Sequence, residues 1–220
     1  MEILKNKEQN FKLSLFYNMK RNIGGYMSRL DLVVLGFLNR QPMHGYEIIG
    51  YFEKRGIEMW TRVKTPSVYK ALQRLEKKDF ITGEMKQEGN NPPRKVFTIT
   101  AAGKEYFMEI LRSFLWGKGQ FQTPFDFWNA FRFIQKNISH DEFIRVLENR
   151  ELKHEEMERI MKEKHKQAVE CGDMPDFPFY AKIMHKSVKK MKALELEIIN
   201  EMKSAAILDE NRKDFKEEKE

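Results

Sequence analysis

The sequence predicts a mostly α-helical protein with one small β-hairpin, and three observations support this fold class. Apolar residues recur at helical spacing through most of the chain. Two short segments of strand-like composition are separated by a turn rich in Gly, Asn and Pro at residues 88–93. Two long helical segments follow residue 139. The 220 residues are enough for one domain with an appendage or for two small domains.

Composition excludes several classes of protein. Hydrophobic residues make up 41% of the chain and charged residues 33%, so most of it can fold. No apolar run reaches the roughly 18 residues of a membrane-spanning helix, and the N-terminus lacks the apolar core and cleavage site of a secretion signal. The single cysteine, Cys171, cannot form an internal disulfide. These features favour the reducing cytoplasm.

The positive charge lies in the first half of the chain. The net charge is +3 over residues 1–26, +5 over residues 27–116 and −1 over residues 117–220, which together give +7. A basic module beside a charge-balanced helical module favours a polyanion partner for the basic module alone.

The first two helices are predicted between residue 28 and residue 56. Ser28 is a candidate N-cap, with Asp31 near the helix start where its charge suits the helix dipole. Pro42 and Gly45 interrupt the chain before the second helix. The inward positions of that helix are open between two sets, which are Tyr46, Ile49 and Phe52, or Ile48 and Phe52.

A third helix is predicted from Thr65 to about Lys77. Thr65 supplies a cap and Pro66 suits the first helical position. The spacing directs one set of side chains inward, namely Val68, Ala71, Leu72 and Leu75. Another set points outward, namely Ser67, Tyr69, Lys70 and Gln73, whereas Arg74 is expected either outward or paired with Glu76 or a neighbouring helix.

Two strands, residues 81–87 and 94–98, follow the third helix and form a basic hairpin. Thr100 then caps a further helix that reaches about residue 115. Three helices followed by a basic hairpin make a winged helix-turn-helix, in which one helix enters the major groove of DNA and the wing lies over phosphates. The expected DNA-binding residues are Arg62, Lys64, Thr65, Ser67, Tyr69, Lys70, Gln73, Lys86, Arg94 and Lys95.

An aromatic-dense segment follows the short hinge at residues 117–119. Two roles are open for it, because large aromatic rings can pack the core of a dimer or line a pocket for a flat aromatic effector. Packing is the favoured role. The residues concerned are Trp116, Phe121, Phe125, Trp128 and Phe131.

The C-terminal half is predicted to contain two long antiparallel helices. Ser139 and Glu142 fit a capping box that opens the first helix, which reaches about Glu170. The second helix extends from about Phe179 to Leu208, and the tail after Asp209 is expected to fray. An imperfect heptad seam is expected to join the two helices and serve dimerisation, through Phe143, Leu147, Tyr180, Met184, Met191, Leu194 and Ile198.

The motifs of catalytic and metal sites are missing from the sequence. It contains no phosphate-binding glycine loop, nucleophile elbow or HExxH pattern. His44, in a turn, is interpreted as a structural cap. Cys171 is interpreted as an inert turn residue. We therefore expect no enzyme, no metal and no cofactor.

The motifs of the first half closely resemble the PadR family of bacterial transcriptional regulators. The resemblance covers about residues 28–107, and the second half is similar to the longer branch of the family by pattern and length only. The matching segments are Leu35-Gly36-Phe37-Leu38, Pro42-Met43-His44-Gly45-Tyr46-Glu47, Ser67-Val68-Tyr69, Leu72-Gln73-Arg74-Leu75-Glu76 and Pro92-Pro93-Arg94-Lys95-Val96-Phe97.

The resemblance implies a homodimer that binds an inverted-repeat operator, usually as a repressor, with Tyr69 contacting DNA and the C-terminal helices forming an antiparallel dimerisation arm. Domains are accordingly expected at residues 27–116 for DNA binding and 117–220 for dimerisation. The family pattern starts near Met27, so residues 1–26 are interpreted either as upstream sequence wrongly included or as a genuine basic arm. The alternative function is a winged-helix module that assembles a protein complex without binding DNA.

Overall fold

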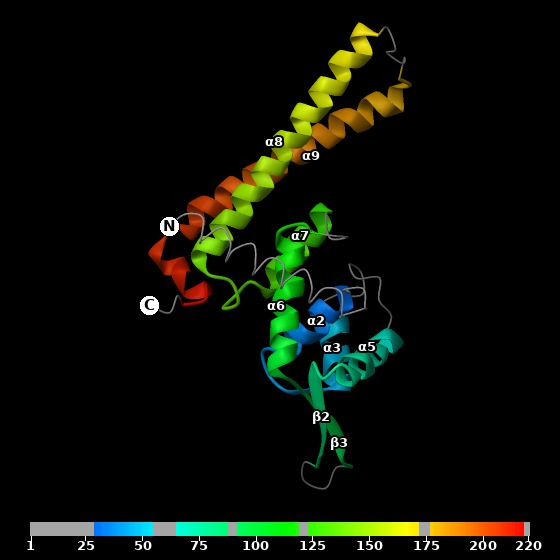
Figure 1. Ribbon diagram of the computed structural model, residues 1–220, viewed down its shortest axis with the longest axis vertical. Coiled ribbons are helices and arrows are strands. Elements are labelled where there is room, and N and C mark those ends of the chain that lie inside the picture. Colours follow the sequence, from blue (N-terminus) through cyan, green and yellow to red (C-terminus); the bar gives the residue numbers. More distant parts are fainter. Residues whose placement is uncertain (1–28, 55–64, 88–91, 119–122, 172–176, 218–220) are drawn as a thin grey trace, which may run out of the picture. The chain divides into compact units, whose positions relative to one another are not determined.

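The computed structural model describes residues 29–54, 65–87, 92–118, 123–171 and 177–217 (Figure 1). Predictions for residues 1–28, Gly56 and the tip of the hairpin lie outside these ranges. The chain divides into two compact units, which meet in sequence between Phe107 and Met108. No helix in the described ranges is both long and apolar enough to cross a membrane.

Three helices build most of the first unit, namely α2 (Arg29–Leu38), α3 (Gly45–Lys54) and α5 (Thr65–Lys77). The interior face of α2 is apolar almost throughout, and nine of its ten residues are buried. The start of α3 is closed by Glu47, whose carboxylate accepts the backbone N–H of His44 at 2.6 Å. Ile48 and Phe52 are the buried positions of α3, so the second of the two expected inward sets is confirmed.

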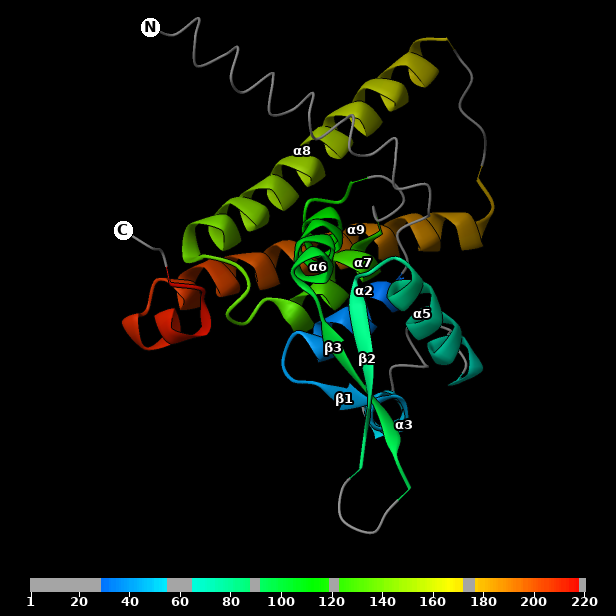
Figure 2. The same cartoon turned by 60° about the horizontal axis from the view of Figure 1, so that its bottom comes forward.

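A three-stranded antiparallel sheet completes the first unit. Strand β2 (Ile81–Lys86) pairs with β3 (Arg94–Ile99), which also pairs with a two-residue strand, β1 (Met43–His44). Figure 2 shows β2 and β3 extending together as a hairpin beyond the short β1. Only one face of each long strand is covered, because Ile81, Phe97 and Ile99 are buried while most other positions are exposed. The mostly α-helical fold class with a small hairpin is confirmed, and β1 is an addition to the prediction.

Helix α6 (Ala101–Leu115) begins in the first unit and ends in the second. Thr100 caps it as expected, since its hydroxyl accepts the backbone N–H of Gly103 at 3.0 Å. The aromatic-dense segment forms α7 (Pro124–Ala130) and a single 3₁₀ turn, η1 (Phe131–Phe133). Thr123 caps α7 by accepting the N–H of Asp126 at 3.1 Å.

Two long helices, α8 (His140–Glu170) and α9 (Phe179–Ala206), form an antiparallel pair. Figures 1 and 2 both show them close together where α8 begins and diverging toward the connection between them. Ser139 caps α8 by accepting the N–H of Glu142 at 3.2 Å, as the sequence predicts. At the base of the pair, Val146, Leu147 and Ile199 are fully buried.

Charged side chains hold the middle of the α8–α9 pair. Arg150 on α8 donates to Glu195 on α9 at 2.9 Å, and both side chains are about 90% buried. The imidazole of His154 also lies 2.9 Å from Glu195. Burial lowers the pKa of His154, and the carboxylate of Glu195 opposes that shift. The helices are therefore joined by a polar cluster at the level where an apolar seam is expected.

The expected heptad seam does not join α8 to α9, because most of its α9 residues are exposed in the single chain. Leu194 and Met191 on α9 are exposed in the single chain, and Met184 is 66% exposed. Phe143 and Leu147 are buried inside the single chain. The spacing of the apolar stripe on α9 is present, but a different face of α9, which includes Glu195 and Ile199, meets α8.

The tail after Asp209 does not fray at once. It forms a 3₁₀ helix, η2 (Asp209–Asp214), and Phe215 then inserts among other rings, with its centroid 5.1 Å from that of Phe143. Two backbone hydrogen bonds tie the tail to the turn before α8, from Lys136 to Asp214 and from Lys216 to Ile138, each of 2.9 Å. Burial of the Phe215 ring therefore holds this segment in place, although most of its residues are charged.

Candidate nucleic-acid interface

Helix α5 presents two chemically distinct faces. Val68, Ala71, Leu72 and Leu75 are all at most 1% exposed, so the predicted inward set is confirmed. Tyr69, Lys70 and Gln73 are exposed on the other face, and Ser67 is half-buried. The exposed face carries an amide, an ammonium and a phenol, all of which can form hydrogen bonds to base edges or phosphates.

A buried carboxylate fixes α5 from behind. Asp31 on α2 is buried and accepts a hydrogen bond from the guanidinium of Arg74 on α5 and another from the hydroxyl of Tyr106, at 3.4 Å. Burial raises the pKa of Asp31, and the charge of Arg74 acts against that rise. Arg74 thus pairs with a neighbouring helix, one of the two outcomes expected for it, and anchors α5 through Asp31.

The ring of Tyr69 lies against the start of α3. A Cβ atom at Gly45 would lie 3.0 Å from Cε1 of Tyr69, so a side chain there would push the ring by a few tenths of an ångström. This contact covers one edge of the ring and leaves Tyr69 48% exposed. The phenol is therefore held in place at the surface and remains accessible.

A second exposed tyrosine, Tyr46, stands beside the wing. It is 50% exposed, which excludes the one of the two open inward sets of α3 that contains Tyr46. Its ring stacks on His44, with centroids 5.5 Å apart, and the guanidinium carbon of Arg94 lies 4.9 Å from the ring centroid. This stack links β1, α3 and β3, and holds Arg94 at the end of β3 next to the hairpin turn, opposite Lys86.

The three expected cations of the wing differ in their surroundings. Lys86 is exposed and only 4.0 Å from Glu84, the outer limit of an ion pair. Arg94 stacks on Tyr46. The ammonium of Lys95 is 2.7 Å from the carboxylate of Glu76 on α5, so it already has an anionic partner within the protein.

The remaining DNA-binding candidates are only partly described. Arg62 and Lys64 lie outside the described residues. Thr65 is the first residue of α5, as predicted.

In the second unit, two of the aromatic candidates, Trp128 and Phe131, pack on one another and on neighbouring rings. Ring centroids are 5.1 Å apart for Trp128 and Phe131, and 5.8 Å apart for Phe131 and Phe143. Phe127, which is not among the sequence candidates, is buried at the centre with the guanidinium of Arg150 5.1 Å from its ring. Trp116 is half-buried, Phe125 is 51% exposed, and Phe121 lies outside the described residues.

An exposed apolar stripe follows one face of α9. Its members are three, four or seven residues apart, which places them on one face of the helix, and Ser187 fills the turn between Met184 and Met191. They include most of the α9 residues expected to serve dimerisation, while Ile198 is only half-buried in line with them. The α9 stripe consists of Tyr180, Met184, Met191 and Leu194, all at least 56% exposed.

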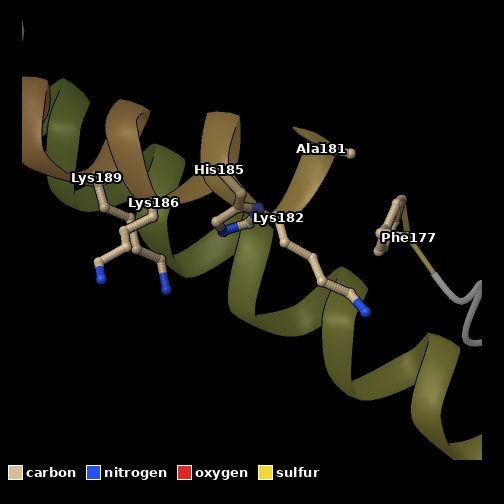
Figure 3. A pocket seen from close by; sticks show the side chains of 6 residues that line it. All are labelled: Phe177, Ala181, Lys182, His185, Lys186 and Lys189. Carbon is tan, nitrogen blue, oxygen red and sulfur yellow. The ribbon is translucent and has the colours of Figure 1, made fainter. Parts of the chain in front are cut away.

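Figure 3 shows a shallow pocket of about 400 Å³ beside the start of α9. Most of its lining comes from successive turns of this one helix, and the lysine side chains extend into solvent (Figure 3). The lining residues are Phe177, Ala181, Lys182, His185, Lys186 and Lys189. The pocket therefore lies apart in sequence from the expected aromatic effector residues.

Potential metal ligands are not gathered into a site. Within the described ranges, no group of three or more His, Cys, Asp or Glu side chains is placed to hold a metal ion. Cys171 is exposed at the end of α8.

Comparison with known proteins gives one consistent family. Residues 34–109 match the model of the transcriptional regulator PadR-like family. The negative transcriptional regulator PadR of Bacillus subtilis is 30% identical over 79 residues, which are 36% of this chain and 43% of that protein. The chain therefore matches less than half the length of this curated relative.

Two solved structures extend the comparison. A PadR-like transcriptional regulator from Bacillus cereus is 32% identical, with a TM-score of 0.34, over 40% of this chain and 81% of that one. Bacillus subtilis PadR in complex with operator DNA is 19% identical, with a TM-score of 0.38, over 83% of this chain and 99% of that one. The matched family region contains α5 and the whole hairpin.

Proposed function

The chain belongs to the family of PadR-like transcriptional regulators, and we propose that it is a homodimer that binds an inverted-repeat DNA operator and represses transcription from it. Helix α5 is the recognition helix in this proposal, and the β2–β3 hairpin is the wing. Two recognition helices held about one DNA turn apart would read the two half-sites.

The observation that carries the proposal is the division of α5 into a fully buried face and a polar exposed face. Gln73 and Lys70 are the proposed base readers, because amide and ammonium groups match the acceptor and donor pattern of purine edges. Tyr69 and Ser67 are proposed to donate hydroxyl hydrogen bonds to phosphates, together with Thr65 at the helix start. Arg62, Lys64, Lys86 and Arg94 are proposed to bind phosphates without reading sequence.

The α9 stripe supports the homodimer. Four large side chains at helical spacing, interrupted only at Ser187, are exposed in the single chain, and such an exposed apolar face is typical of a protein–protein interface. We propose that α9 of one subunit covers this face in the other. Phe143 and Leu147 then serve the dimer only indirectly, by holding the base of the α8–α9 pair in the fold.

A small aromatic effector remains a proposal with a clear test. The contacts among Trp128, Phe131 and Phe143 support a packing role for these rings. Trp128→Ala should therefore weaken dimerisation, measured by light scattering after size-exclusion chromatography. If the variant instead stays dimeric and loses its response to an aromatic effector, the aromatic segment lines an effector pocket.

The experiment that tests the proposed function is a genome-wide capture of the DNA fragments bound by the protein, starting with its own promoter. We expect enrichment of fragments that share two inverted half-sites. Deletion of the gene should raise transcription from those promoters. A flat capture profile, with no fragment enriched, would favour the alternative of a protein-interaction module.

A further inference from the structure

We propose that Glu76 and Lys95 form a latch that positions the wing against the recognition helix, so that Lys95 acts within the protein and does not serve as a phosphate contact. The inference rests on the proposed DNA-binding function. It departs from the sequence-based expectation for Lys95 and gives Glu76 a role in place of the pairing with Arg74 that the sequence left open.

The latch joins two elements that must cooperate on DNA. The ammonium of Lys95, on β3, donates to Oε2 of Glu76 at 2.8 Å and lies 2.7 Å from Oε1. Glu76 belongs to the last turn of α5, so the contact crosses from the wing to the recognition helix. The charge-assisted hydrogen bond to Oε2, together with the close ion-pair contact to Oε1, fixes the direction of the lysine side chain.

Strand β2 lies between the two elements and leaves room for the latch at Gly83. A Cβ atom there would be 2.1 Å from Cε of Lys95 and 2.7 Å from Oε1 of Glu76. Both clashes involve the far ends of flexible side chains, and the backbone stays clear. A side chain at position 83 would therefore displace the latch and keep the strand.

The backbone of Lys95 is held as well. Its carbonyl oxygen lies 3.3 Å from Nδ1 of His44. A carbonyl can only accept a hydrogen bond, so this contact requires the proton to be on Nδ1. Lys95 is thus secured at the backbone by β1 and at the ammonium by α5.

Because it is paired with Glu76, the ammonium of Lys95 contributes little to the binding of phosphates. An ammonium already paired with a carboxylate adds little net positive charge to the wing, so it releases few counterions when DNA binds. The two side chains remain 42% and 32% exposed. Exposed ion pairs add little to folding stability, so the latch can be broken without unfolding the domain.

The test compares Glu76→Met, Lys95→Met and the double variant by measuring operator affinity at several salt concentrations. A loosened wing lowers the fraction of molecules ready to bind, so each single variant should bind about threefold to tenfold more weakly. The double variant should be no weaker than either single variant. The slope of log affinity against log salt should stay unchanged in all three.

Gly83→Ala provides a variant that keeps both charges. It should weaken binding as much as Glu76→Met, with no further loss when the two are combined. Lys86→Met is the matched control in the wing, where losing a phosphate contact should reduce the salt slope by about 0.9. Thermal melting should show each variant folded.

Whether Glu76→Met weakens or strengthens DNA binding distinguishes the latch from a direct phosphate contact by Lys95. If Lys95 instead binds phosphate, removing the neighbouring carboxylate should strengthen binding, and Lys95→Met alone should flatten the salt slope. Either result overturns the latch and leaves the proposed function intact. If the wild-type protein shows no preference for any DNA sequence, the proposed function and the latch fail together.

Discussion

Gln73 is the residue whose chemistry is best suited to sequence reading. It is exposed on α5, one turn from the accessible phenol of Tyr69. An amide can bond to both N6 and N7 of adenine, and such a pair contributes about 1–3 kcal/mol of discrimination. Gln73→Ala should therefore relax the base preference at one position of each half-site, measured by selection from a randomised operator library.

Gln167→Ala is the matched control for this change. Gln167 is an exposed helical glutamine on α8, so the chemical change is the same in the other unit of the chain. It should leave base preference unaltered. If Gln73→Ala leaves every preference unchanged as well, Gln73 does not read bases.

The Asp31–Arg74 pair yields a pH-dependent prediction for stability. Arg74→Met leaves a buried carboxylate without its guanidinium, at a cost of about 2 kcal/mol when that carboxylate is ionised. Burial raises the pKa of Asp31 in the folded state. Its stabilising contribution is therefore present below its unfolded pKa and is lost as the pH rises through the folded pKa. Losing Arg74 raises that pKa further and enlarges the effect.

Urea unfolding at a series of pH values measures this difference. The loss of stability in Arg74→Met should be small in acid and should grow toward neutral pH. Adding Asp31→Asn removes the ionisable group and should flatten the pH dependence. An equal loss at every pH would show that Arg74 stabilises α5 by packing alone.

The two residues also show how far the sequence can predict a site. The buried and exposed faces of α5 follow from helical spacing, and the structure confirms the inward set. The partner of Arg74 does not follow, because Asp31 is 43 residues away. The spacing of α3 allows two inward sets, one of which contains Tyr46, and only the burial of Ile48 and Phe52 in the folded chain decides between them.

The face of α9 that contacts α8 differs from the face that carries the exposed apolar stripe. The α9 stripe is exposed, whereas Glu195 and Ile199 on another face contact α8. Leu194→Asp should therefore break the dimer without unfolding the chain, because it places a charge on the apolar face. Analytical ultracentrifugation measures the oligomeric state and circular dichroism the helix content.

Ala193→Asp adds the same charge one residue earlier on α9, at another exposed position. Successive helical residues point about 100° apart, so this control lies off the stripe. It should remain dimeric. If Leu194→Asp also remains dimeric, the α9 stripe is not the interface.

At the scale of elements, the sequence predicts where each helix lies along the chain better than it predicts which elements that helix contacts. Periodicity locates the apolar stripe of α9 but does not show which neighbour covers it, and the polar cluster of Arg150, His154 and Glu195 lies at the α8 contact in its place. The charged composition after residue 209 also does not predict the helix η2. This segment is ordered because the ring of Phe215 is buried against residues far away in the chain. Strand β1 is two residues long and exists only through its pairing with β3.

Across the whole molecule, the distribution of charge agrees with the proposed roles of the two halves of the chain. The excess of positive charge lies before residue 117, in the part that contains α5 and the wing, and the remainder is close to neutral. A basic reader and a nearly neutral helical pair fit a protein in which one unit binds DNA and the other joins two copies.

The central claim is that this protein reads a DNA sequence, and a single titration tests it most directly. The wild-type protein is titrated at physiological salt against an operator fragment recovered by genome-wide capture and against the same fragment with both half-sites scrambled. We predict that two chains bind each operator and that affinity for the operator exceeds that for the scrambled fragment by a factor on the order of 10³ or more. Equal affinity for the two fragments would contradict the account.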